Sequence, residues 1–283
     1  MKFGVFFEGI SRTALIAAAQ KAEELGFESL WRPDHLALPV EIAPTYPYSA
    51  DGAAPLDPNW AIVDTLTVLG FVAAVTEKIM LGTNVFILPL RHPVQTARTV
   101  LGIDFLSRGR MLFGVGAGWL EEEFRIAGQD FHTRGARMDE SIEILRALWT
   151  QETITYAGKH YQLGPLHFEP KPYAKPHPPI IIGGESEAAL RRAGRLGDGW
   201  YGVRHGPEKM AEFKAKLDEQ RARYGRDHLP FQITVNARPD ITVEEVRRFE
   251  EAGVDRLVMQ LWRASSQAIP SMERFHEAVL SKV

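Results

Sequence analysis

The sequence predicts an α/β protein whose strands close into a single (β/α)8 TIM barrel. Short runs of β-branched or aromatic residues alternate with helical patterns along the chain, which is typical of repeated βα units around a parallel sheet. Eight such units can be counted in the 283 residues. That number favours a closed barrel over an open doubly wound sheet. We therefore expect residues 1–283 to form one domain, with insertions at about 37–59 and 135–169.

The first four units are expected within the first 118 residues. Apolar residues spaced three and four apart follow the first strand and predict a helix that ends at Gly26, a residue suited to a left-handed C-terminal cap. The four strands are expected at Phe3–Phe7, 28–33, 79–88 and 110–118, and the helices run through Leu15–Leu25, Leu66–Val75 and about Val94–Phe105.

The other four units are expected after the second insertion. Their strands are predicted at 179–184, 199–203, 231–236 and 255–260, and a helix over 271–280 closes the chain. The first insertion, rich in Pro, Tyr and Ala, is too long for a mere connector. The second reads as a long helix followed by a hairpin, because residues 154–163 alternate about an Ala-Gly turn.

Composition excludes several classes of function. The chain has 33 Lys and Arg residues against 36 Asp and Glu residues, a net charge of −3, which argues against nucleic acid as a partner. It has no cysteine, so it can form no disulfide, no thiolate nucleophile and no Cys-ligated metal site. Redox chemistry therefore requires a bound cofactor. No run of about 18 apolar residues and no signal-peptide pattern occurs, so we expect a cytoplasmic protein without a membrane partner.

The common phosphate and metal motifs are missing. There is no Walker loop and no H-E-x-x-H helix, and the three glutamates at 121–123 begin a helix, where they favour its dipole; we expect no metal site. The run "GVGAG" lacks the third glycine of a dinucleotide fingerprint. We expect Gly116 and Gly118 instead to keep the open carboxyl end of the barrel, its mouth, clear for a flat ring.

The segment "PPIIIGGESEAALRRAG" predicts an anion site at the mouth. Gly183 and Gly184 allow close backbone approach, Ser186 can donate or cap, and the following helix offers unpaired N–H groups to a phosphate. The alternative is that the glycines only turn a strand into a helix. Glu185 counts against an anion there unless its side chain points elsewhere.

Asp34 and His35 follow the second strand and form the second candidate. A histidine at a strand's carboxyl end titrates near neutral pH and can move a proton, while the adjacent carboxylate can orient it or bind another donor. Neighbouring residues point to opposite faces, so Asp34 can serve structure while His35 faces the cavity. The alternative is a histidine that only caps the loop. His92, before a proline, is expected at a helix entry.

With these segments in view, the chain resembles the bacterial luciferase-like superfamily of flavin-dependent barrels. Within it, the chain is most similar to the branch that uses the deazaflavin coenzyme F420 (8-hydroxy-5-deazaflavin). The resemblance spans nearly the whole chain, and its most specific part is the block at 183–200. The matching segments are 31–39, 79–119, 134–149, 176–200 and 250–260.

The resemblance implies a homodimer with the deazaflavin ring at the mouth and its phosphate at Gly183, Gly184 and Ser186. It implies that the histidine matching His35 is the acid/base and that Asp34 lies near the ring. It also implies a non-proline cis peptide at Asn84-Val85, bulging against the ring's back face.

One departure from related sugar-phosphate dehydrogenases concerns the substrate. Where they place a catalytic Glu after the strand-four glycines, this chain has Trp119, which argues for a less polar substrate. Tyr46, Tyr48 and Trp60 of the first insertion are expected to roof the pocket, or else only to pack on the barrel.

These observations favour an oxidoreductase that moves a hydride between C5 of F420 and a small organic substrate, with His35 handling the proton. One alternative is an FMN-dependent monooxygenase supplied with reduced flavin by a separate reductase. The other is a non-catalytic flavin-binding protein.

Overall fold

Eight parallel strands close into a barrel, which confirms the predicted fold class. The computed structural model describes residues 1–7, 11–43, 46–49, 51–54, 56–57 and 61–283. Pairing between β3 and β5 closes the circle, whose order is β3-β2-β1-β11-β10-β9-β8-β5. The strands are β1 Lys2–Phe6, β2 Ser29–Arg32, β3 Met80–Thr83, β5 Met111–Gly116, β8 Ile180–Gly183, β9 Gly199–Gly202, β10 Gln232–Ala237 and β11 Arg256–Met259.

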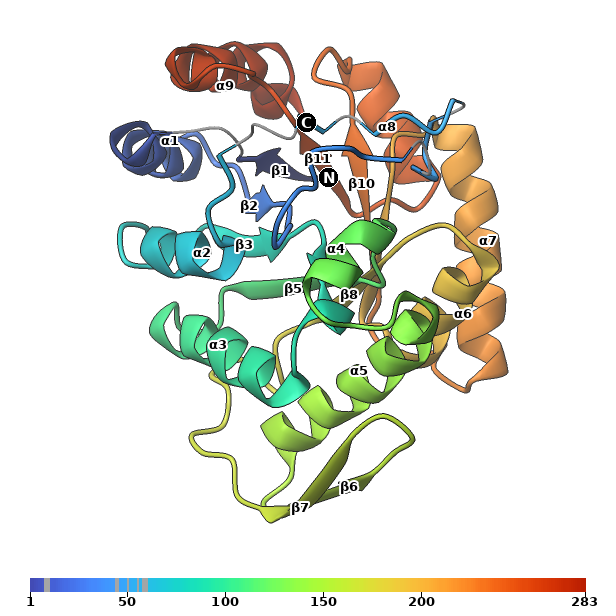
Figure 1. Cartoon of the computed structure of the whole chain (residues 1–283). Helices are drawn as coiled ribbons and strands as arrows, with labels where there is room; N and C mark the ends of the chain where they lie inside the picture. The colour runs from blue at the N-terminus through green and yellow to red at the C-terminus, as the bar shows by residue number, and fades with distance from the viewer. Residues whose placement is uncertain (8–10, 44–45, 50, 55, 58–60) are drawn as a thin grey trace.

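Helices surround this barrel on all sides (Figure 1). The helix after β1 ends where Gly26 takes a φ of 84°, as the sequence predicts. None of the helices in the part of the chain that the structure describes is long and apolar enough to cross a membrane. The helices are α1 Arg12–Glu24, α2 Thr65–Ala73, α3 Pro93–Leu106, α4 Glu121–Ile126, α5 Arg134–Thr150, α6 Glu187–Leu196, α7 Pro207–Arg223, α8 Val243–Glu251 and α9 Ala268–Ala278.

The third strand differs from its prediction. Instead of one strand over 79–88, β3 stops at Thr83, the Asn84-Val85 peptide bond is cis, and a two-residue strand β4 (Phe86–Ile87) then pairs with the end of β5. The 3₁₀ turn η1 (Leu88–Leu90) follows. The cis bond is the one that the resemblance implies.

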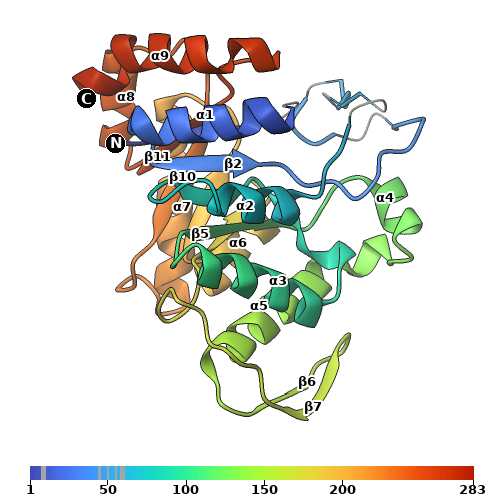
Figure 2. The same cartoon turned by 90° about the vertical axis from the view of Figure 1, so that its left-hand side faces the viewer.

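The second insertion has the predicted form. After α5, β6 (Ile154–Ala157) and β7 (Gln162–Leu166) form an antiparallel hairpin, which lies outside the barrel beyond α5 (Figure 2). The described residues of the first insertion form no helix or strand. The last helix begins at Ala268, three residues before its predicted start, after the 3₁₀ turn η3 (Ser265–Gln267).

A small apolar cluster fills the inside of the barrel. Its members come from five different strands, so they meet at the barrel axis, and the side chain of Val85 packs against them. This cluster forms the floor of the mouth. It consists of Trp31, Leu112, Ile181, Tyr201 and Val258.

Candidate functional site

The loops that follow the strands all lie at one end of the barrel, because the strands are parallel. Figure 2 shows the first insertion and α4 at this end, opposite the two chain termini. The candidate residues after β2, β3, β5 and β8 therefore share the mouth.

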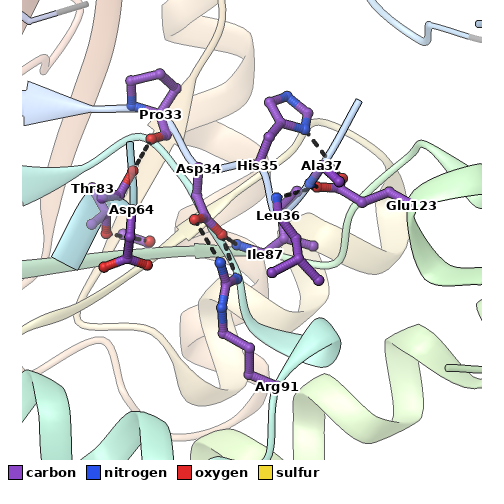
Figure 3. Close-up of polar contacts among 12 residues, drawn as sticks. Pro33, Asp34, His35, Leu36, Ala37, Asp64, Thr83, Ile87, Arg91 and Glu123 are labelled. Carbon is purple, nitrogen blue, oxygen red and sulfur yellow. Dashed lines mark hydrogen bonds and ion pairs between the residues drawn. The ribbon is translucent and has the colours of Figure 1, made fainter. Parts of the chain in front are cut away.

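His35 is held by the carboxylate of Glu123, to which the sequence analysis gave only a role at the helix dipole. Its Nδ1 lies 3.1 Å from Oε2 of Glu123, and the other oxygen of Glu123 accepts from the amides of Leu36 and Ala37 (Figure 3). The side chain of Glu123 is 0% exposed and that of His35 is 16% exposed. The pair therefore leaves Nε2 of His35 as the nitrogen that can exchange a proton at the mouth.

All three glutamates at 121–123 lie in the first turn of α4, as predicted, but Glu123 has a second role that the sequence analysis missed. Glu121 forms an exposed ion pair with Arg125, as expected for a first-turn carboxylate. Glu123 instead shares a buried face with Leu120 and Phe124. The sequence holds no clear signal for this burial, because Glu123 stands in a run of three glutamates and its partner His35 is 88 positions away.

Asp34 points away from His35 and into an ion pair (Figure 3). Its carboxylate oxygens accept from the two terminal nitrogens of Arg91 at 2.6 and 2.9 Å, and from the amide of Ile87 at 3.0 Å. Burial raises the pKa of Asp34, and the charge of Arg91 opposes that shift. Asp34 ties the loop after β2 to the β4–η1 segment, and its nearness to a cofactor ring stays a prediction.

Val85 forms a ridge between two of the predicted glycines. A Cβ on Gly116 would lie 2.6 Å from Cγ2 of Val85, and a Cβ on Gly183 would lie 2.7 Å from its Cγ1. Such distances are too short for a real Cβ contact. Both positions therefore need glycine because the side chain of Val85 packs against their Cα atoms. The sequence analysis expected the space beside Gly116 to be clear for a flat ring, but the side chain of Val85 fills it.

Two buried carboxamides meet at the hydroxyl of Tyr201, whose ring belongs to the cluster that packs against Val85. The side chain of Asn84 donates to the hydroxyl of Tyr201 at 3.3 Å, and Asn236 also bonds to that hydroxyl, whose pKa burial raises. Oδ1 of Asn84 and Oδ1 of Asn236 lack hydrogen-bond partners within the described residues. Buried acceptors of this kind fit the N–H groups of a heterocyclic ring. The mouth therefore fits a flavin or deazaflavin.

The turn at 183–186 has the geometry of a capped helix start. Gly184 takes a φ of 112°, its carbonyl accepts from the indole of Trp200 at 2.7 Å, and Ser186 caps α6 by accepting from the amide of Ala189 at 3.2 Å. The Ser186 side chain thus caps, one of its two predicted roles.

The carboxylate of Glu185 is engaged by the loop after β9. It accepts from the amide of Val203 at 2.8 Å and pairs with Nε2 of His205 at 2.9 Å. The carboxylate is therefore bonded to the loop after β9 and not to the amides of its own turn. His92 accepts from the amide of Val94 at the start of α3, which confirms its prediction as a helix-entry residue.

Aromatic side chains of the first insertion cross the mouth. The ring of Tyr46 lies 5.1 Å from that of Trp119 and 5.4 Å from that of Tyr48. The hydroxyl of Tyr48 accepts from the backbone amide of Glu185, and burial followed by the charge of Glu185 raises its pKa to about 12. Tyr48 is therefore a neutral phenol that contacts the proposed anion turn. Trp60 lies outside the described residues.

The fold places the chain in a class of proteins. It is a (β/α)8 barrel whose candidate site residues lie at the carboxyl ends of the strands. The chain belongs to the luciferase-like monooxygenase family, whose pattern matches residues 1–275. It is accordingly a luciferase-like oxidoreductase.

Relatives of both cofactor types are similar to the chain. An uncharacterised protein of Mycobacterium tuberculosis is 31% identical over 280 residues, 96% of each chain. The F420-dependent glucose-6-phosphate dehydrogenase of Amycolatopsis mediterranei is 27% identical and covers 94% of this chain and 86% of its own. The FMNH(2)-dependent dimethylsulfone monooxygenase of Pseudomonas putida is 31% identical over 62% of this chain and 48% of its own.

The fold is shared with solved structures of low sequence identity. The monooxygenase RslO1 from Streptomyces bottropensis superposes with a TM-score of 0.78 at 20% identity, over 99% of both chains. This likeness supports the fold.

Proposed function

We propose that the protein is an F420-dependent oxidoreductase that transfers a hydride to or from a small organic substrate. The observation that supports this most is the pair of buried oxygens on Asn84 and Asn236, which have no hydrogen-bond partner among the described residues and would accept from the N–H groups of a flat ring lying on the Val85 ridge. The choice of the deazaflavin is supported by the A. mediterranei relative, whose match covers most of both chains. When bound, that cofactor supplies hydride chemistry at C5.

The chain's own residues would supply position and a proton. His35 exposes part of its imidazole at the mouth while its Nδ1 contacts Glu123, so Nε2 would give or take the proton that accompanies the hydride. The first amides of α6 would bind the anionic tail of the cofactor. Trp119 and Tyr46 would line an aromatic pocket for the substrate.

A second candidate is an FMN-dependent monooxygenase that receives reduced flavin from a separate reductase, and the P. putida relative favours it. Titration of the apo-protein with each cofactor separates the two. We expect micromolar affinity for F420 and much weaker affinity for FMN. Micromolar binding of FMN with none of F420 would reverse the choice. Anaerobic single-turnover spectroscopy with reduced cofactor and a substrate panel would then identify the substrate class.

The contact between Tyr48 and the turn gives a further prediction. An anion bound at the Glu185 amide must displace the Tyr48 hydroxyl, so Tyr48→Phe should tighten cofactor binding. The variant removes one hydrogen bond that competes with the anion, worth about 1 kcal/mol. Kd for the cofactor should therefore fall roughly fivefold. Fluorescence titration with F420 measures this change.

Tyr46→Phe is the matched control, since it alters a phenol of the same aromatic cluster. It should leave Kd within about twofold, because the ring of Tyr46 packs on Tyr48 and Trp119 rather than on the turn. An unchanged or weaker affinity in Tyr48→Phe would show that the anion does not use this amide.

A further inference from the structure

We propose that Glu123 is the positioning residue for His35: it fixes the imidazole as the Nδ1–H tautomer and directs Nε2 to the substrate. The inference rests on the proposed role of His35 as the proton carrier. It adds a residue to which the sequence analysis gave no part in the site.

The contacts of Glu123 join the ring to its own main chain. One carboxylate oxygen contacts Nδ1 of His35, and the other accepts from the amides of Leu36 and Ala37. The ring and the backbone that carries it are therefore fixed to one rigid group. Glu123 itself sits on α4, whose Phe124 is buried against Ile87 and Leu90, so the carboxylate has a firm support.

An acceptor-only carboxylate selects the tautomer. A neutral imidazole has one N–H and one lone pair, and a carboxylate at Nδ1 requires the N–H to be there. Nε2 then carries the lone pair that accepts a proton from the substrate. When the proton arrives, the imidazolium lies beside a negative charge that is 0% exposed, where the attraction is stronger than in water.

The competing explanation is that Glu123 only anchors the start of the first insertion through the Leu36 and Ala37 amides. Glu123→Gln distinguishes the two. The carboxamide oxygen of Gln can still accept from both amides, while its NH2 group donates to Nδ1 of His35. The variant therefore keeps the hydrogen bonds from the Leu36 and Ala37 amides. It reverses the tautomer of His35, because the proton of the neutral ring must then lie on Nε2.

The experiment combines imidazole NMR with kinetics. In protein labelled with ¹⁵N-histidine, we expect His35 to carry its proton on Nδ1 in the wild type and on Nε2 in Glu123→Gln. With F420 and a turned-over substrate, kcat should fall by about 10²-fold or more in the variant, because the wrong nitrogen is protonated. KM and the melting temperature should change little, since the loop contacts remain.

Glu121→Gln is the matched control. It neutralises an exposed carboxylate in the first turn of the same helix, 50% exposed and paired with Arg125. It should leave both the tautomer and kcat unchanged.

Three results would overturn the proposal: a wild type protonated on Nε2, a Gln variant that keeps Nδ1–H, or a Gln variant with the reversed tautomer and unchanged kcat. The tautomer is read in the cofactor-free protein. If the wild type turned over no substrate with F420, the proposed function would fail, while the NMR would still decide whether Glu123 sets the state of His35.

Discussion

Replacement of His35 by alanine should lower kcat by about 10²- to 10⁴-fold, the usual contribution of a positioned acid/base. The imidazole has a second nitrogen, Nε2, that can exchange a proton at the mouth, and Glu123 holds the ring in one orientation. Cofactor affinity should change little, because the ridge at Val85 and the turn at 183–186 are untouched. Stopped-flow measurement of hydride transfer, with parallel cofactor titration, separates the two quantities.

The protein should stay folded in this variant. Glu123 keeps two of its donors, the amides of Leu36 and Ala37, so its carboxylate is not left unpaired. Added imidazole should restore part of the lost rate.

The control for this variant is His167→Ala, which removes an exposed histidine beyond the β6–β7 hairpin. It should leave kcat unchanged. Unaltered turnover in His35→Ala would instead assign the proton to another group, and an absence of turnover in the wild type with either cofactor would favour the non-catalytic flavin-binding alternative.

The fold could be predicted because its determinants are local. Strands buried on both faces read as continuous apolar runs, and each is followed by a helix with apolar residues three and four apart. The break in the third strand was different. The run over 79–88 shows no proline until after it ends, so periodicity alone predicts one strand, and only the family resemblance indicated the cis bond at Asn84-Val85.

The site was only partly predictable because its contacts are long-range. His35 meets Glu123 across 88 positions and Asp34 meets Arg91 across 57, and local spacing cannot reveal such pairs. The sequence marked Gly183 as a place where something approaches the backbone, and it marked Gly116 as a residue that keeps the mouth clear; in the structure the side chain of Val85 packs against both. The sequence could not show that the approaching group is the side chain of Val85, because that requires the closed barrel.

Substituting Asp34 by alanine should lower the free energy of unfolding by about 3 kcal/mol, at the lower end of the range for breaking a buried ion pair. The substitution removes the carboxylate that pairs with Arg91 and accepts from the amide of Ile87. The side chain of Arg91 is 19% exposed, so water can solvate it in part, which limits the cost. Urea unfolding followed by circular dichroism measures the change.

A double-mutant cycle with Arg91→Leu tests the cause. Leucine keeps an apolar contact with the Phe86 ring, over which the guanidinium lies at 4.2 Å, and removes the charge. If the ion pair is the source of the effect, the double variant should be more stable than the sum of the single losses predicts, by about 1 kcal/mol or more. Additive losses would contradict it.

The same variants decide between the two roles of Asp34. Because both of its oxygens are already used by Arg91 and Ile87, Asp34 has little capacity left for a cofactor ring. Cofactor affinity, measured where each variant is fully folded, should therefore be nearly equal in the double variant and the wild type. A large loss of affinity in that stable background would place Asp34 at the ring, as the resemblance to F420 enzymes implies, and would make the ion pair its support.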